Sequence, residues 1–261
     1  MDPMTDQHNL SDVSSFYDAL SAEYDLMTGF DNRFIRERPF FRMFVDRYQI
    51  STAVDAGCGT GFHSLLLAQL GVSVTAVDIS GEMLAKVAAH AKELSLPVKT
   101  IRARFEDLSA DLTGLVDAVF SLGNSLAHIL SAENLLSVLK NFHAILKPGG
   151  ALFLQVLNYD RIMKVKERIQ NTKQIESKTF VRFYDYNEGS VVFNILEIDK
   201  SKGLPEEKLI SVSLRPVSSK DLIDLLEKSG FRDIQVYGGI SLQGFLPEQS
   251  QDLVVIAKKP E

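Results

Sequence analysis

A glycine-rich turn at residues 55–61, with the sequence Asp-Ala-Gly-Cys-Gly-Thr-Gly, constrains the fold of this chain more than any other feature. An apolar pattern typical of a buried strand precedes the turn, and an amphipathic helix pattern follows it. Glycine tolerates positive φ angles and lets another molecule approach the backbone closely. The N–H groups at the start of the helix also attract negatively charged groups. The turn therefore predicts a strand–turn–helix unit with a ligand lying against its backbone.

Strand and helix patterns alternate through most of the 261 residues, which predicts a doubly wound α/β fold around a mostly parallel sheet. The strands of this sheet are expected at 51–56, 72–77, 97–101, 116–121, 151–157, 232–238 and 251–258. Its helices are expected at 12–28, 37–48, 62–70, 82–94, 135–146 and 218–229. Between them, 158–175 is typical of a polar helix, and 178–186, 190–198 and 207–214 alternate apolar and polar residues. That segment predicts a small antiparallel sheet inserted into the domain.

These patterns divide the chain into three expected parts. Residues 1–48 form an N-terminal helical cap, and residues 49–157 and 216–261 form the main ligand-binding domain. Residues 158–215 form an inserted lid subdomain. A locally basic stretch in the insert, between 161 and 182, is expected to be a solvated helix face.

Composition excludes several classes of protein. No apolar run approaches the roughly 20 residues that cross a bilayer, so no membrane association is expected. Cys58 is the one cysteine, which excludes an internal disulfide and favours a cytoplasmic location. It stands in the glycine turn, where a small residue suffices, and is not expected to be a nucleophile. The net charge of −6 disfavours nucleic acid as a partner.

The cofactor is predicted from the glycine spacing and two carboxylates. Asp78 closes the second strand, beside the first, where a carboxylate can accept both hydroxyls of a ribose. The G-x-G-x-G spacing matches the dinucleotide pattern G-x-G-x-x-G poorly, and Asp55 would repel a pyrophosphate. S-adenosylmethionine has a ribose, a sulfonium and an ammonium but no phosphate, so it suits this site better than NAD. A turn that merely packs helix on strand is the alternative without a ligand.

Three motifs resemble those of the class I S-adenosylmethionine-dependent methyltransferases. They are 54–61, 77–84 and the Lys-Pro-Gly-Gly turn at 147–150, and the resemblance spans roughly 15–258. It implies a Rossmann-like, seven-stranded sheet that binds S-adenosylmethionine. Phe105 would stack on the adenine, Met83 would cover its other face, and Arg33 would bind the methionine carboxylate, with Arg36 and Arg38 as competing choices. The implied cofactor-binding positions are Tyr17, Arg33, Asp55, Gly57, Gly59, Gly61, Asp78, Ile79, Met83, Arg104, Phe105, Glu106 and Leu122.

The loop at 122–128, Leu-Gly-Asn-Ser-Leu-Ala-His, resembles the corresponding loop of glycine/sarcosine N-methyltransferases. The resemblance implies that Asn124 and His128 face the methyl acceptor, with Tyr24 from the N-terminal cap as a third catalytic candidate. The Asn124 carbonyl could then accept a proton from an amine and orient its lone pair. The D/N-P-P-Y/F loop of nucleic-acid amino methyltransferases is absent, and this argues against DNA as the acceptor.

Leu157 departs from the resembled group, whose members carry an arginine there that grips the carboxylate of an amino acid. An aliphatic side chain cannot make that bidentate bond. Either another arginine replaces it, with Arg161 and Arg182 nearest in the insert, or the acceptor is not glycine. The lid tyrosines Tyr184 and Tyr186 would line the acceptor pocket or lie on the sheet surface.

We therefore expect a methyltransferase that acts on a small molecule, as an N-methyltransferase of a small amine. The alternatives are an O- or C-methyltransferase of a metabolite without a carboxylate, and a cofactor-binding protein without catalysis. No cluster of residues has the spacing of a metal site, so no metal is expected.

Overall fold

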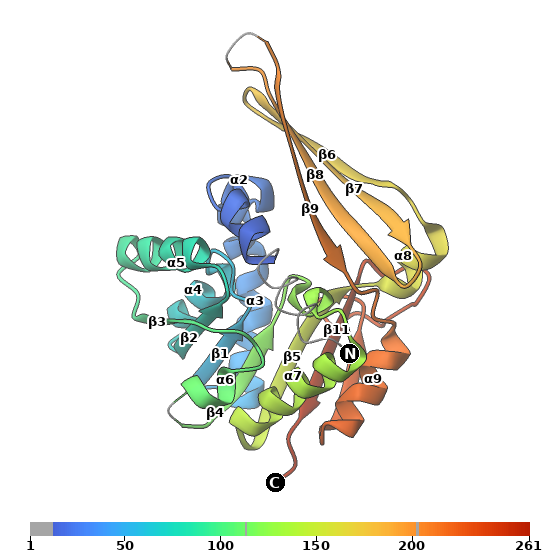
Figure 1. Ribbon diagram of the computed structural model, residues 1–261. Coiled ribbons are helices and arrows are strands. Elements are labelled where there is room, and N and C mark those ends of the chain that lie inside the picture. Colours follow the sequence, from blue (N-terminus) through green and yellow to red (C-terminus); the bar gives the residue numbers. More distant parts are fainter. Residues whose placement is uncertain (1–12, 113, 202–203) are drawn as a thin grey trace.

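A seven-stranded sheet forms the centre of the computed structural model, which describes residues 13–112, 114–201 and 204–261 (Figure 1). Its strands are β1 (Thr52–Ala56), β2 (Ser73–Asp78), β3 (Val98–Arg102), β4 (Val116–Ser121), β5 (Leu146–Leu157), β10 (Arg232–Tyr237) and β11 (Asp252–Lys258). They lie in the order β10-β11-β5-β4-β1-β2-β3. β1 to β5 run parallel, and β11 runs antiparallel to both of its neighbours. The predicted doubly wound, mostly parallel sheet is confirmed.

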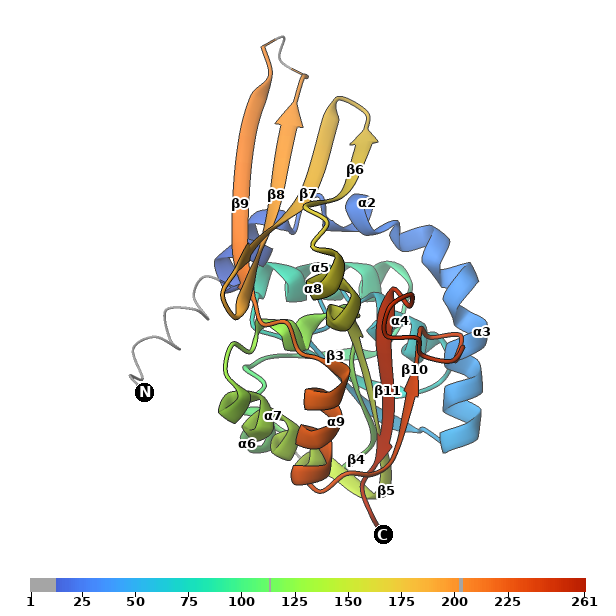
Figure 2. The same cartoon turned by 90° about the vertical axis from the view of Figure 1, so that its right-hand side faces the viewer.

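Helices cover both faces of this sheet. α3 (Phe30–Tyr48), α4 (Phe62–Gln69) and α5 (Gly81–Glu93) lie on one face, and α6 (Leu108–Asp111), α7 (Ala132–Ile145) and α9 (Ser219–Lys228) on the other (Figure 2). Successive strand residues bury into opposite layers: Ala53 packs with α3 and α4, and Val54 packs with α7 and α9. With both faces filled, a ligand fits at the carboxyl edge. None of the described helices is long and apolar enough to cross a membrane.

The N-terminal segment is more broken than its sequence predicts. Residues 13–20 are helical, a turn follows at 21–23, and α2 (Tyr24–Thr28) then ends at Gly29, whose φ is 69°. Gly29 also begins α3, which starts seven residues before the predicted start at 37 and continues through Pro39. The predicted single helix at 12–28 is therefore wrong at 21–23, and residue 12 lies outside the described part of the chain. The left-handed conformation of Gly29 lets the segment turn over the carboxyl edge.

The insert between β5 and α9 carries a second sheet, which projects beyond one end of the central sheet (Figure 1). After α8 (Tyr159–Val165) come β6 (Ile169–Ile175), β7 (Lys178–Asn187), β8 (Ser190–Asp199) and β9 (Glu206–Leu214), paired antiparallel in chain order. The antiparallel insert is confirmed, but the predicted helix at 158–175 is wrong beyond Val165. β6 is a polar edge strand, so its sequence lacks the apolar alternation that marks the other three.

Basic residues of the insert bind the N-terminal segment. Lys173 Nζ donates to the Leu26 carbonyl at 2.7 Å, and Lys178 Nζ lies 2.8 Å from Glu23 Oε1. The expected solvated helix face is therefore wrong for these lysines, which lie on β6 and β7. Their ammonium groups instead satisfy backbone and carboxylate oxygens of the segment that the insert faces. These contacts tie the inserted sheet to the N-terminal segment.

Candidate active site

The glycine turn joins β1 to α4, and two of its glycines are required by packing. At Gly57, with φ 76°, a Cβ would lie 2.6 Å from Oγ of Ser125. At Gly61, with φ 89°, a Cβ would lie 2.9 Å from the side chain of Val87. Both positions therefore exclude any larger residue. Gly61, one of the predicted cofactor-binding residues, does not line the site cavity. Its lack of a side chain instead lets α4 pack against α5.

Asp78 connects this turn to the end of β2. One carboxylate oxygen accepts the N–H of Gly59, and the other accepts the N–H of Ser80, each at 2.9 Å. Only 8% of Asp78 is exposed, and burial raises the pKa of its carboxyl group. Each carboxylate oxygen can accept a further hydrogen bond. Asp78 therefore fixes the turn and still presents acceptors to the cavity that it lines.

This cavity opens at the carboxyl edge, above the glycine turn. Twelve of the predicted site residues line it, together with the unpredicted Thr28, Phe62 and His63. The predicted residues are Tyr17, Tyr24, Arg33, Gly57, Gly59, Asp78, Ile79, Arg104, Phe105, Glu106, Leu122 and His128. The N-terminal segment, β2, the loops after β3 and β4 and the start of α4 thus converge on one space.

The end of the cavity at Phe105 suits a nucleobase. Phe105 lies between β3 and α6 and makes an edge-to-face contact with Phe142, with ring centroids 5.7 Å apart. Beside it, Nε of Arg104 and Oε2 of Glu106 are buried and form an ion pair at 3.6 Å, without a hydrogen bond to either atom in the described part of the chain. A flat apolar surface next to buried polar groups fits an adenine, whose edge carries both donors and acceptors.

Two predicted cofactor residues, Asp55 and Met83, do not line the cavity. Asp55 is 1% exposed, and its Oδ2 accepts the hydroxyl of Ser64 on α4 at 2.6 Å. Burial also raises the pKa of Asp55. Met83 is fully buried on α5. The Asp55 side chain therefore points under the turn, and the Met83 side chain points into the core rather than toward the cavity where Met83 was expected to cover the adenine.

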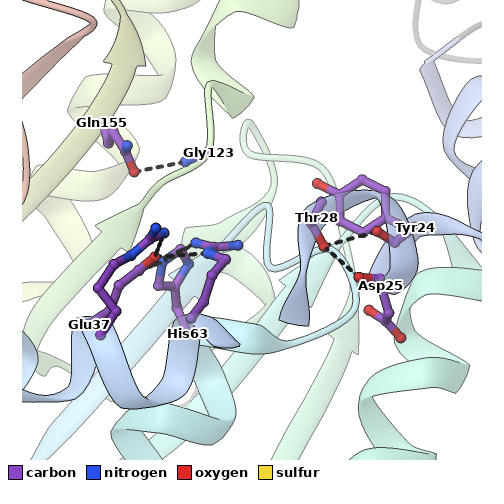
Figure 3. A network of polar contacts seen from close by, with 9 residues as sticks. Tyr24, Asp25, Thr28, Glu37, His63, Gly123 and Gln155 are labelled. Carbon is purple, nitrogen blue, oxygen red and sulfur yellow. Dashed lines mark hydrogen bonds and ion pairs between the residues drawn. The ribbon is translucent and has the colours of Figure 1, made fainter. Parts of the chain in front are cut away.

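Arg33 is held in the cavity by three neighbours. Its Nε donates to Oε1 of Glu37 at 2.8 Å, and its Nη2 lies 3.3 Å from Nε2 of His63. The guanidinium lies over the Phe62 ring, 4.0 Å from the centroid. Figure 3 shows Glu37 and His63 on one side of the site, and Tyr24 and Thr28 of α2 on the other. Because Glu37 occupies the Nε edge of Arg33, only the remaining edge is open to a ligand carboxylate.

Glu37 is a charged residue that is only 4% exposed. Burial alone would raise the pKa of Glu37, but hydrogen bonds from His63 and Arg33, with the charge of Arg33, lower it to about 2. The carboxylate is therefore ionised at neutral pH and fixes Arg33. Of the three competing arginines, Arg33 lines the cavity, whereas Arg36 and Arg38 are exposed.

A second cavity adjoins the first, beneath the inserted sheet. Its wall includes Leu157, Arg161, Arg182, Tyr184 and Asp252, so it lies between β5, α8, β7 and β11. Six residues line both cavities: Tyr17, Tyr24, Thr28, Arg33, Gly123 and His128. Two of the three predicted catalytic residues, Tyr24 and His128, therefore stand where the cavities meet.

A hydrogen bond between neutral groups crosses this shared wall. The hydroxyl of Tyr17 lies 2.8 Å from Nε2 of His128, in a direction set by the imidazole tautomer. Burial lowers the pKa of His128 to about 4 and raises the pKa of Tyr17 well above its usual value. Burial likewise raises the pKa of Tyr24. At neutral pH this wall presents uncharged hydroxyl and imidazole groups.

Asn124, the third predicted catalytic residue, lines the second cavity but has structural partners. Its Oδ1 accepts the N–H of Leu157, and its Nδ2 donates to the hydroxyl of Tyr159, both at 3.0 Å. Its φ of 76° is a conformation that asparagine adopts more readily than most residues. Asn124 therefore ties the loop after β4 to the end of β5, and its carbonyl is already engaged.

Asp252 lines the second cavity at the start of β11 and is not among the residues predicted for the site. Because β11 is antiparallel, its first residue reaches the carboxyl edge and pairs with Leu157 of β5. Burial raises the pKa of Asp252, against the effect of a hydrogen bond with Gln155. The sequence does not show that β11 runs antiparallel, and this direction is what places Asp252 at the carboxyl edge. Across residues 13–112, 114–201 and 204–261, no cluster of His, Cys, Asp or Glu is placed to hold a metal ion.

Because of the contacts of Glu37, the free energy of unfolding depends on pH in the acidic range. A carboxylate with a folded-state pKa near 2 and an ordinary value of 4.5 stabilises the fold above about pH 4.5, and the contribution is lost as the pH falls toward 2. We expect Glu37→Gln to lower the free energy of unfolding at pH 7 by on the order of 3 kcal/mol. Urea unfolding across this pH range should show a flatter pH dependence for the variant than for the wild type.

The control is Glu248→Gln, which removes an exposed carboxylate paired with Lys164 and should leave the curve close to that of the wild type. If the free energy of unfolding of the wild type and of Glu37→Gln changed with pH in parallel, the lowered pKa of Glu37 would be contradicted.

The chain is similar to known methyltransferases in sequence and in fold. Residues 53–150 match the family described as a methyltransferase domain. The chain is 27% identical over 246 residues to a glycine/sarcosine N-methyltransferase of Halorhodospira halochloris, covering 90% of this chain and 84% of the relative. It is 26% identical over 225 residues to the enzyme of the same name from Aphanothece halophytica, covering 86% and 83%. An S-adenosylmethionine-dependent methyltransferase structure from Clostridium acetobutylicum ATCC 824 has the same fold, with a TM-score of 0.81, 15% identity and coverage of 94% and 99%. The chain is an S-adenosylmethionine-dependent methyltransferase that resembles the glycine/sarcosine N-methyltransferases.

Proposed function

We propose that this enzyme methylates the nitrogen of a small amine, held in the cavity beneath the inserted sheet. The observation that carries the proposal is the wall shared by the two cavities, where Tyr17, Tyr24 and His128 stand. A group on the cofactor side can meet an acceptor at this wall without crossing bulk water. Similarity over most of the chain to enzymes named glycine/sarcosine N-methyltransferases supports nitrogen as the acceptor atom.

The first cavity fits the cofactor through its own side chains. S-adenosylmethionine, when bound, supplies a methyl group on a positively charged sulfur, which a neutral nitrogen displaces in line. Asp78 would accept the ribose hydroxyls, Phe105 would cover the adenine, and the open edge of Arg33 would take the methionine carboxylate. The glycine turn keeps these groups at one edge of the sheet.

The second cavity would hold the amine in its neutral form. The hydroxyl oxygens of Tyr17 and Tyr24 offer lone pairs that can accept the N–H bonds and aim the nitrogen lone pair, and His128 orients the Tyr17 hydroxyl. Asp252 provides a negative charge that attracts an incoming ammonium and can accept its proton. We assign Asn124 a positioning role, because its amide holds Leu157 and Tyr159.

The alternative is methyl transfer to oxygen or carbon of a metabolite without a carboxylate. Leu157 favours it, since this position at the end of β5 is aliphatic where the resembled group has an arginine.

We also propose that residues 1–48 and 158–215 act as caps on the domain formed by 49–157 and 216–261. The ion pair of Lys178 with Glu23 and the bond from Lys173 to Leu26 support joint movement of the two caps.

Methyl transfer to amines tests the proposal directly. The enzyme should transfer labelled methyl from S-adenosylmethionine to members of a panel of small primary and secondary amines, and not to the matched alcohols, because the neutral wall favours a nitrogen nucleophile. Product mass spectrometry identifies the methylated atom. Transfer to the alcohols alone would establish the alternative and overturn the proposal.

Asp78→Asn should weaken cofactor binding. The amide replaces one acceptor oxygen with a donor that faces the N–H of Gly59 or Ser80. We expect a loss of about 1–3 kcal/mol, or roughly 5- to 150-fold in Kd, by calorimetry. Asp117→Asn is the control, since Asp117 lies at the opposite end of the sheet beside Thr52. Equal losses in the two variants would remove Asp78 from the cofactor site.

His128→Gln should lower the rate by the same factor at every pH between about 6 and 9. The pKa of His128, lowered to about 4, leaves the imidazole neutral throughout this range. The ratio of wild-type to variant kcat/KM, measured with one amine, checks this. A ratio that changes with a midpoint near 6.5 would show that His128 titrates during catalysis.

A further inference from the structure

An ion pair joins the N-terminal segment to the main domain beside the first cavity. Nε2 of His90 on α5 lies 3.3 Å from Oδ2 of Asp25 on α2, and the two side chains are 22% and 24% exposed. Asp25 stands on α2 with Tyr24 and Thr28, which line the first cavity (Figure 3). The pair therefore attaches a wall of that cavity to α5.

The other ring nitrogen of His90 fixes where its first proton lies. Nδ1 lies 3.2 Å from the carbonyl oxygen of Thr60 in the glycine turn. Because a carbonyl can only accept a hydrogen bond, Nδ1 carries the hydrogen. In a neutral imidazole, Nε2 would then present a lone pair to the carboxylate of Asp25, and the two would repel each other. The contact between His90 and Asp25 therefore favours a second proton on the ring, at Nε2.

Charged groups from four elements share a surface groove with His90. Asp25 comes from α2, Arg38 from α3, Glu93 from α5 and Lys173 from β6. Two of them are negative and two are positive, so their formal charges balance. The carboxylate of Asp25, in contact with the ring, thus acts on His90 against a neutral background.

The N-terminal segment is attached to α5 differently from the way it is attached to the insert. Its apolar side chains pack in one cluster with those of the inserted sheet. Toward α5 it makes polar contacts, the ion pair of Asp25 with His90 and a hydrogen bond from the Ser80 hydroxyl to Asp18. Gly29 links α2 to α3 with φ 69°, and no described atom lies within 4 Å of the place of its Cβ. The segment can therefore turn about Gly29 and leave α5 without opening an apolar core.

We propose that His90 and Asp25 are positioning residues that dock the N-terminal segment on α5, so that cofactor binding takes up a proton at His90. A cofactor in the first cavity would contact both the glycine turn and the segment, and would favour the docked state. Protonated His90 favours the same state, and linkage requires each to strengthen the other. The inference rests on the proposed place of the cofactor and is independent of the acceptor. Affinity for the cofactor falls as the pH rises from about 6 to 8, where histidine loses its proton.

Calorimetry of S-adenosylhomocysteine binding measures this proton directly. The binding enthalpy at about pH 7 is compared in buffers that differ in their enthalpy of ionisation, and the slope gives the number of protons taken up. We expect the wild type to take up roughly 0.2–0.4 proton per ligand more than His90→Gln, whose amide can contact Asp25 but does not titrate. Between pH 6 and 8 the wild type should lose about two- to fivefold more affinity than the variant, the scale of a partly exposed ion pair.

Asp25→Asn keeps the imidazole and removes the charge that favours its second proton, so the extra uptake should disappear in this variant as well. His143→Gln is the matched control, because His143 lies on α7, on the other face of the sheet, against Phe231. It should keep the wild-type uptake. Retained ligand binding shows that each variant is folded. Equal uptake by the wild type and His90→Gln, or wild-type uptake by Asp25→Asn, would overturn the proposal.

Asp78→Asn separates this inference from the proposed cofactor site. Weaker binding by Asp78→Asn, with equal proton uptake by the wild type and His90→Gln, would overturn the proton-dependent docking and leave the cofactor site standing. Proton uptake that depends on His90, with unchanged affinity in Asp78→Asn, would overturn the ribose contact and leave the docking standing.

Discussion

The hydrogen bond between Tyr17 and His128 is the interaction on which the rest of the site depends. It joins the N-terminal segment to the short 3₁₀ helix at Ser125–His128, which follows β4, across the wall that the two cavities share. Without it, the segment that carries Tyr24 would have fewer contacts to hold it over the glycine turn. The bond also joins two groups that burial keeps neutral, whereas Arg33, which lines both cavities as well, carries a positive charge that is paired with Glu37.

Charged groups line both cavities. The first cavity, proposed for the cofactor, has Asp78 at the end of β2, and Arg33, which lines both, is fixed by Glu37. The second cavity, proposed for the acceptor, has Asp252 at the edge of the central sheet and Arg161 and Arg182 on the insert. The inserted sheet therefore does more than cover the site: one of its strands, β7, supplies both the Lys178 contact to Glu23 and Arg182 in the wall of the second cavity.

The sequence predicted what local patterns determine. Glycine spacing and the place of Asp78 at a strand end predicted that these residues meet at the carboxyl edge, where they line one cavity, because parallel strands bring their carboxyl ends together. It failed where a residue's role depends on distant partners. Nothing near Asn124 shows that Leu157 and Tyr159 use its amide, and nothing near Asp252 shows that its strand runs antiparallel. β6 was missed because an edge strand with polar residues on both faces has no apolar period.

The central claim is that the cofactor's sulfur faces the wall shared by the two cavities. A crystal structure of the enzyme with S-adenosylhomocysteine tests it most directly. We predict that the ribose hydroxyls contact Asp78, that the adenine lies on Phe105, and that the sulfur points toward Tyr17, Tyr24 and His128 with the second cavity open beyond it. A nucleoside in the second cavity, or a sulfur turned away from that wall, would contradict the account.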